Sequence, residues 1–115
     1  MLFRSDTKPA MRVNCNEVFA PLVTVTPYDD FDAALELVNA SNFGLHAGVF
    51  TSGNARIFRA FERLEVGGVI VNDIPTYRID HMPYGGVKDS GFGREGIRYA
   101  MEEMTEPRIM VLNLR

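Results

Sequence analysis

The alternation of strand-like and helix-like segments between residues 22 and 71 constrains the fold more than any other feature of this sequence. Residues 22–28 (LVTVTPY) are rich in β-branched side chains, which is typical of a buried strand. Asp29 or Asp30 then supplies the side-chain cap for a helix. The apolar residues of that helix fall on one face: Phe31, Ala34, Leu35 and Val38.

The same unit is repeated directly afterwards. Residues 47–51 (AGVFT) predict a second short strand, and Ser52 is positioned to cap a second amphipathic helix. Gly67 and Gly68 end this helix, and residues 69–71 predict a third strand. The order βαβαβ with short connections predicts an α/β fold, in which helices cover a parallel sheet.

The remainder of the chain predicts a long loop, a helix and a terminal strand. Residues 73–90 show no period and contain two prolines, and a loop of this length in a small domain usually carries function. Residues 94–104 have apolar side chains at helical spacing, and Pro107 closes that helix. Residues 108–115 (RIMVLNLR) are apolar and strand-like. A strand edge of this kind favours pairing with another chain.

Composition excludes several functional classes. Among 115 residues, 46% are hydrophobic, so a packed core is possible and a disordered chain is not expected. A net charge of -3 argues against nucleic acid and anionic membranes as partners. The one cysteine cannot form an internal disulfide and has no ligand cluster around it, so we expect a cytoplasmic protein without a metal site. No apolar run is long enough for a signal peptide or a membrane span.

The glycine-rich residues 91–96 match the letters G-x-G-x-x-G but lack the context of a dinucleotide-binding turn. That turn must directly follow a strand, whereas the preceding predicted strand ends near Val71. The acidic residue expected about 20 positions later is also absent. We therefore predict a turn into the last helix, with Ser90 as its cap and with Arg94 and Glu95 in its first turn.

Cys15 has no sequence neighbour that predicts catalysis. A nucleophilic thiol needs a base, a cation or a helix N-terminus to lower its pKa, and the flanking residues are asparagines. The two histidines, His46 and His81, form no recognisable triad with it. The residues alone therefore predict an α/β fragment with a functional loop and no catalytic residue.

Two motifs nevertheless resemble those of the NAD(P)-dependent aldehyde dehydrogenases. Residues 16–21 (NEVFAP) resemble the family motif E-[IV]-F-G-P, and residues 82–95 (MPYGGVKDSGFGRE) resemble its motif P-[FY]-G-G-x-K-x-S-G-x-G-R-E. Shorter matches lie between them in family order, so the resemblance covers essentially the whole chain. The branch it resembles includes lactaldehyde, succinate-semialdehyde and phosphonoacetaldehyde dehydrogenases.

This resemblance implies that the chain is a C-terminal part of a larger enzyme. Residues 1–106 correspond to the end of the catalytic domain, and residues 107–115 to a strand that joins subunits into a homo-oligomer. The family's nucleophilic cysteine and its glutamate base lie upstream of this region, so Cys15 is not the nucleophile. We expect the isolated chain to be inactive.

The resemblance also assigns cofactor and substrate contacts. Glu17 would accept hydrogen bonds from the nicotinamide ribose of NAD or NADP, and Phe19 would pack beside the nicotinamide ring. Ala20 departs from the more common glycine of the motif.

Residues 73–84 correspond to the family's substrate entrance. There, Arg78 and His81 would bind a small anionic or hydroxylated aldehyde. The alternative for Arg78 is a surface ion pair with Asp80 or Asp73. The alternative for the whole chain is a non-catalytic module that self-associates through its last strand.

Overall fold

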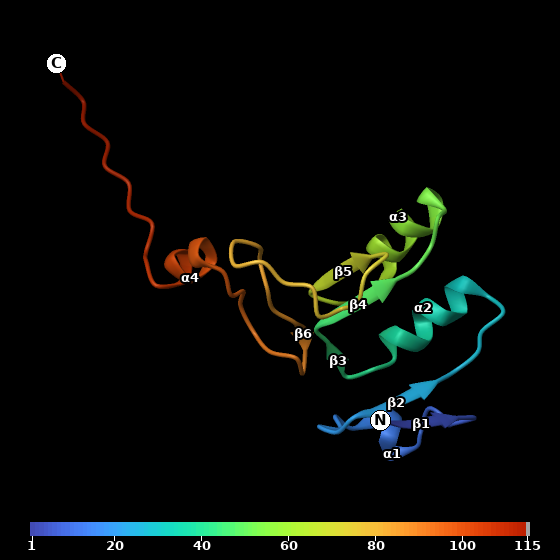
Figure 1. Ribbon diagram of the computed structural model, residues 1–115. Helices are drawn as coiled ribbons and strands as arrows, with labels where there is room; N and C mark the ends of the chain where they lie inside the picture. Colours follow the sequence, from blue (N-terminus) through green and yellow to red (C-terminus); the bar gives the residue numbers. More distant parts are fainter. Residues whose placement is uncertain (115) are drawn as a thin grey trace.

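Two parallel strand pairs and one short antiparallel pair organise the chain, which the computed structural model describes over residues 1–114 (Figure 1). In chain order the elements are β1 (Leu2–Ser5), α1 (Arg12–Cys15), β2 (Leu22–Val25), α2 (Phe31–Asn39), β3 (Phe43–Gly44), β4 (His46–Val49), α3 (Asn54–Arg63), β5 (Gly68–Val71), β6 (Val87–Lys88) and α4 (Ile97–Glu103).

The unit β4-α3-β5 confirms the second predicted repeat. Strands β4 and β5 pair in parallel, with His46 opposite Gly68 and Val49 opposite Val71. Helices α2 and α3 contribute to a small core around this pair, but the predicted apolar faces are only partly buried. Leu35 of the predicted α2 face is buried, whereas Val38 is exposed. On α3 the buried residue is Ala60, and Phe58 and Phe61 of the predicted face are exposed. The buried core residues are Leu35, Val49, Ala60 and Leu64.

The predicted βαβαβ order is correct, but its three strands do not form one sheet. Strand β2 pairs in parallel with β1, with Leu22 opposite Leu2, and β4 pairs only with β5. Between them, β3 pairs antiparallel with β6, with Phe43 opposite Lys88. The ammonium of Lys88 donates to the carbonyls of Asn39 and Ser41 at 2.6 and 3.2 Å, and these bonds hold the returning chain beside the end of α2.

The predicted cap of α2 is confirmed and that of α3 is wrong. A carboxylate oxygen of Asp30 accepts a hydrogen bond from the Ala33 N–H at 2.7 Å. Helix α3 begins at Asn54 with Gly53 as its N-cap, one residue later than a Ser52 cap requires. The hydroxyl of Thr51 accepts from the Gly53 N–H at 3.2 Å, so a serine/threonine turn precedes the helix instead.

The start of α4 also differs from the prediction. The helix begins at Ile97, so Arg94 and Glu95 precede it, and the Ser90 hydroxyl accepts from the Gly44 N–H at 2.9 Å instead of capping it. Three glycines in this segment have positive φ angles, a conformation that interrupts helical geometry: Gly91 at 118°, Gly93 at 70° and Gly96 at 111°.

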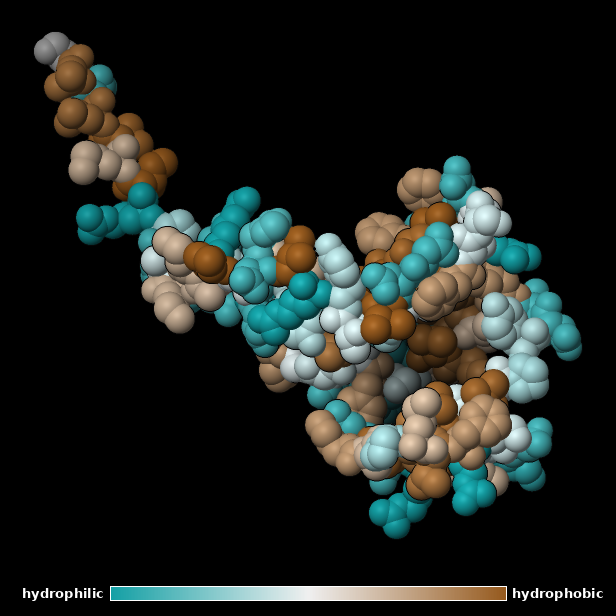
Figure 2. All heavy atoms as spheres, viewed as in Figure 1, coloured by the Kyte–Doolittle hydropathy of each residue, from teal (hydrophilic) through white to brown (hydrophobic). Residues whose placement is uncertain are grey.

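The C-terminal residues extend away from the body of the molecule (Figure 1). Residues 106–114 form no strand within the described chain, and Arg115 lies outside it. Strand formation at 108–115 therefore remains a prediction that needs a second chain. Figure 2 shows hydrophobic residues along this tail and around a hollow in the body.

The chain exposes more surface than a closed folded monomer of its mass. Its accessible surface is 9629 Å², whereas a folded monomer of this size exposes about 6300 Å². Many large hydrophobic side chains contribute to this exposed surface, and apolar surface of this extent marks contact with other protein surfaces. None of the helices in residues 1–114 is both long and apolar enough to cross a bilayer.

Candidate functional site

Glu17 and Phe19 lie in the exposed connection between α1 and β2. The phenyl ring of Phe19 is 91% exposed. In the part of the chain that is described, the carboxylate of Glu17 has no ion pair or hydrogen bond. The connection itself is ordered by backbone bonds: Ala20 N–H donates to the Val18 carbonyl at 2.9 Å, and Leu2 N–H donates to the Pro21 carbonyl at 2.6 Å. The carboxylate and the aromatic ring lie two residues apart in this connection, and both are accessible.

These two side chains fit the roles that a nicotinamide cofactor requires. A carboxylate with two free oxygens accepts hydrogen bonds from ribose hydroxyls, and an exposed aromatic ring offers a flat apolar surface. The roles of Glu17 and Phe19 at one end of NAD or NADP remain predictions, and the exposure of both residues is compatible with them.

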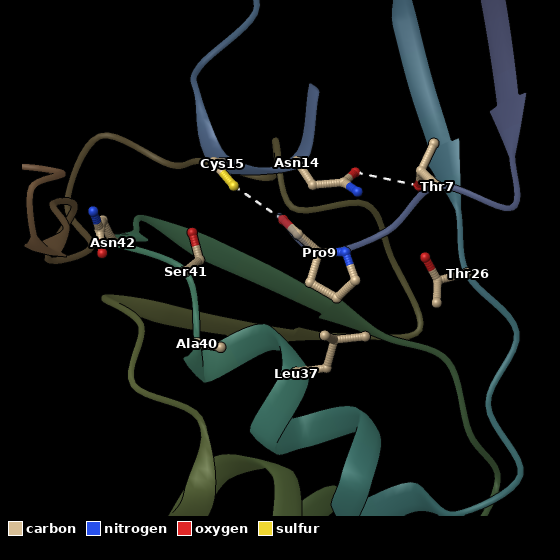
Figure 3. Close-up of a pocket in the computed structure, with 9 residues that line it drawn as sticks. All are labelled: Thr7, Pro9, Asn14, Cys15, Thr26, Leu37, Ala40, Ser41 and Asn42. Carbon is tan, nitrogen blue, oxygen red and sulfur yellow. Dashed lines mark hydrogen bonds between the residues drawn. The ribbon is translucent and has the colours of Figure 1, made fainter. Parts of the chain in front are cut away.

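Cys15 lies nearby but lines a different feature, a cavity of about 310 Å³ (Figure 3). Its thiol donates to the Pro9 carbonyl at 2.9 Å, so Sγ acts there as a hydrogen-bond donor. The other lining residues carry no acid or base: Thr7, Pro9, Asn14, Thr26, Leu37, Ala40, Ser41 and Asn42. The cavity therefore offers no group that could activate the thiol as a nucleophile.

Arg78 contacts Glu95 and Tyr84, neither of which was predicted as its partner. One of its terminal N–H groups (Nη2) donates to the Glu95 carboxylate at 2.8 Å. Its guanidinium carbon lies 4.4 Å from the ring centroid of Tyr84, which is a cation-π contact. The surface ion pair of the alternative prediction is thus present, but its partner is Glu95, so the predicted partners Asp80 and Asp73 are wrong.

Tyr84 and Glu95 are themselves joined through their backbones. The Tyr84 N–H donates to the Glu95 carbonyl at 3.1 Å, and the Glu95 N–H donates to the Tyr84 carbonyl at 2.6 Å. This antiparallel bridge brings the two partners of Arg78 together. The sequence signal for it is the glycine-rich turn, which reverses the chain between the two residues.

His46 packs against the Tyr84 ring. The two rings meet edge to face with centroids 5.0 Å apart. The Nδ1 of His46 lies 3.0 Å from the Pro75 carbonyl, and because a carbonyl only accepts, the proton is on Nδ1. Its Nε2 is buried and has no hydrogen-bond partner among residues 1–114.

His81 is exposed and lies apart from the Arg78 contacts. It lines a shallow groove of about 510 Å³ along α4, together with Arg98 and Glu102. These two side chains form an ion pair at 2.8 Å, and the hydrogen bond from Arg98 to Glu102 raises the pKa of that guanidinium. Over residues 1–114, no hydrogen bond or ion pair links His81 to Arg78, or either of them to Glu17.

Both ends of the loop at 73–84 are anchored. At its start, Asn72 has a positive φ of 56°, its N–H donates to the Val49 carbonyl at 2.9 Å, and its side-chain oxygen accepts from the Thr51 N–H at 2.9 Å. Beyond its end, Gly85 packs so closely on Gly67 that a Cβ on Gly67 would lie 1.7 Å from the Gly85 carbonyl oxygen. The described residues contain no cluster of three or more His, Cys, Asp or Glu that could hold a metal ion.

Residues 3–110 match the family model described as the aldehyde dehydrogenase family. The chain is 55% identical over 104 residues to the 3-sulfolactaldehyde dehydrogenase of Priestia megaterium, covering 90% of this chain and 22% of that protein. It is 46% identical over 99 residues to the lactaldehyde dehydrogenase of Methanococcus aeolicus, covering 86% of this chain and 21% of that protein.

Solved structures agree with these relatives. Aldehyde dehydrogenase 21 from Physcomitrella patens, in complex with the reaction product succinate, is 44% identical with a TM-score of 0.87, covering 90% of this chain and 22% of that one. Glyceraldehyde-3-phosphate dehydrogenase from Methanocaldococcus jannaschii, complexed with NADP, is 37% identical with a TM-score of 0.82, covering 89% and 22%. The chain thus spans about a fifth of the length of the proteins it matches.

Proposed function

The chain belongs to the aldehyde dehydrogenase family, and on that premise we propose that residues 1–106 are the C-terminal part of a catalytic domain that oxidises a small aldehyde to its carboxylic acid with NAD or NADP. The observation that carries this proposal is the family match over residues 3–110. The proposed compartment is the cytoplasm, because the single cysteine cannot form an internal disulfide.

In the proposed enzyme, Glu17 and Phe19 bind the nicotinamide end of the cofactor. When bound, the nicotinamide supplies the hydride acceptor. The carboxylate of Glu17 accepts hydrogen bonds from the ribose hydroxyls, and Phe19 restricts the angle of the ring. The free carboxylate and the 91% exposed phenyl ring support these roles.

Arg78 and His81 are the proposed substrate contacts. Arg78 uses one of its five N–H donors for Glu95, so other donors remain for an oxoanion or a hydroxyl on the substrate. The names of the relatives support this class of substrate, because sulfolactaldehyde carries a sulfonate and lactaldehyde carries a hydroxyl. The structure bound to succinate adds a carboxylate to the same series.

The chain supplies binding groups but no proposed catalytic residue, so we expect it to be inactive alone. Purified chain should form no NADH or NADPH from any aldehyde, and turnover would overturn this expectation. The positive test is a chimera in which these residues replace the matching segment of the Priestia megaterium enzyme. We expect the chimera to oxidise 3-sulfolactaldehyde, and Glu17→Ala to raise its KM for the cofactor about tenfold, the loss expected for hydrogen bonds to a charged group.

The C-terminal tail supports a second role, in subunit contact. Its side chains at Ile109, Val111 and Leu114 are more than four-fifths exposed. An unpaired apolar segment of this kind can pair with an edge strand of a second copy. We propose that residues 107–115 join subunits of a homo-oligomer. The alternative, that this chain is a non-catalytic self-association module, uses the same tail. Under that alternative, the chimera should show no dehydrogenase activity.

A further inference from the structure

We propose that Tyr84 and Glu95 are positioning residues that orient the guanidinium of Arg78 toward an oxoanion on the substrate. The inference rests on the proposed substrate role of Arg78 and goes beyond it. It concerns which residues set the direction of the guanidinium, and therefore which substrates it can recognise.

Two contacts of different kinds restrain Arg78. The Tyr84 ring lies 4.4 Å from the guanidinium carbon and supports one face of that planar group. The Glu95 carboxylate, 2.8 Å from Nη2, restricts rotation within the plane. A long side chain at a half-exposed position would otherwise sample many rotamers, so these contacts reduce the entropy lost when an anion binds.

The contacts leave part of the guanidinium free. Within residues 1–114, Arg78 makes no other side-chain hydrogen bond, so Nε and Nη1 keep their N–H donors available. Adjacent donors of this kind match the spacing of two oxygens in a carboxylate or sulfonate. The ion pair with Glu95 is neutral overall, and recognition should therefore depend on the geometry of these donors more than on net charge.

The supports of Arg78 are built on the body of the fold. Tyr84 and Glu95 are joined by two backbone hydrogen bonds, at 3.1 and 2.6 Å. The Tyr84 ring is backed by His46 of β4, whose Nδ1 also binds the Pro75 carbonyl. The position of Arg78 is thus tied to the β4-β5 pair, although Arg78 itself lies in a loop.

The first experiment measures the orientation of Arg78 in the full 115-residue chain, independently of any enzyme activity. In ¹⁵N-labelled chain, we expect restricted rotation to separate the Arg78 Nη resonances. Glu95→Ala and Tyr84→Ala should merge them, whereas Glu95→Gln and Tyr84→Phe should keep them separate, because the amide oxygen still accepts and the phenyl ring still stacks. Separate resonances in both alanine variants would overturn the inference.

The second experiment measures recognition in the Priestia chimera with 3-sulfolactaldehyde and lactaldehyde, which differ by the sulfonate. We expect Glu95→Ala and Tyr84→Ala to lower the preference for the sulfonated substrate about tenfold, the loss expected when a charge-assisted hydrogen bond is misplaced. The change should fall on the KM for 3-sulfolactaldehyde more than on its kcat. Glu95→Gln and Tyr84→Phe should keep the preference for the sulfonated substrate. Glu62→Ala, which removes an equal charge on α3, is the control and should also keep it.

Arg78→Ala distinguishes a failure of the proposed substrate role of Arg78 from a failure of the positioning roles of Tyr84 and Glu95. If this variant leaves the substrate preference unchanged, the proposed substrate role of Arg78 fails and the inference fails with it. If it lowers the preference while the Glu95 and Tyr84 alanine variants do not, the substrate role stands and the positioning inference is overturned. In the Arg78→Ala background, a further Glu95→Ala change should have no additional effect on the preference.

Discussion

The carboxylate of Asp32 on α2 accepts two hydrogen bonds from the guanidinium of Arg59 on α3. These bonds lower the pKa of Asp32 and raise that of Arg59. A second pair, Arg63 with Glu36, joins the same two helices one turn further along. The ion pairs thus fix the packing of the helices whose inner faces form the core.

The lowered pKa of Asp32 predicts a loss of stability in acid. The pair contributes fully above the ordinary aspartate pKa of 3.8, and its contribution disappears as the pH falls through the lower pKa of the folded state. Asp32→Asn should lower the urea midpoint at neutral pH and should approach wild type in strong acid. Asp29→Asn is the control, because Asp29 is an exposed acid just before α2. It should leave the urea midpoint unchanged both at neutral pH and in strong acid.

Asn72 predicts a pair of substitutions with unequal effects. Its positive φ of 56° favours glycine, while its side-chain oxygen binds the Thr51 N–H. Asn72→Ala should lose both the hydrogen bond and the favourable backbone conformation, which lowers the free energy of unfolding by about 2 kcal/mol. Asn72→Gly should lose only the hydrogen bond, which lowers it by about 1 kcal/mol. Amide hydrogen exchange in β4 and β5 measures the difference, and equal loss in both variants would contradict this explanation.

Gly67 tests how closely the loop return packs on β5. A methyl group there would lie 1.7 Å from the Gly85 carbonyl oxygen, so the backbone must move. Gly67→Ala should cost more than about 2 kcal/mol, measured as lost exchange protection in β5. Gly53→Ala is the comparison variant, because the nearest atom to a Cβ there lies 3.7 Å away. It should lower the free energy of unfolding only by the cost of alanine at the N-cap of α3, about 1 kcal/mol.

The C-terminal tail predicts concentration-dependent association. Chain truncated after Glu106 should remain monomeric in sedimentation experiments, whereas the full chain should form a larger species. Replacing Ile109 and Val111 by serine keeps the length of the tail and removes apolar surface, and it should give the same result as truncation. A larger species that survives both changes would place the subunit contact elsewhere.

Local signals explain which parts of the fold were predictable. The Asp30 cap and the unit β4-α3-β5 depend on residues close in sequence, and both were predicted. The β3-β6 pair has two residues on each side and joins segments more than forty positions apart, so neither period nor propensity reveals it. The sequence did not predict Glu95 as the partner of Arg78 for the same reason. Glu95 is distant in sequence, whereas Asp80 and Asp73 lie close to Arg78.

The motifs gave more about the site than the periodic pattern did. The first motif identified Glu17 and Phe19, and the loop that leads into the second motif supplied Arg78 and His81 as candidates. Their roles remain predictions. The structure shows that Glu17 is unpaired in the described chain and that His81 faces the groove at α4. Tyr84 and His46 could not be assigned from sequence, because their relation to Arg78 depends on ring packing between distant segments.

The anchored ends of the loop at 73–84 have an evolutionary consequence. Asn72 fixes its entry, the Pro75 carbonyl lies against His46 of β4, and the Gly67-Gly85 contact and β6 fix its exit, so changes at residues 76–83 need not disturb the strands. New side chains between these anchors would leave the scaffold unchanged. On the proposed substrate role of Arg78 and His81, a lineage could therefore acquire a new aldehyde preference by mutating this one short stretch.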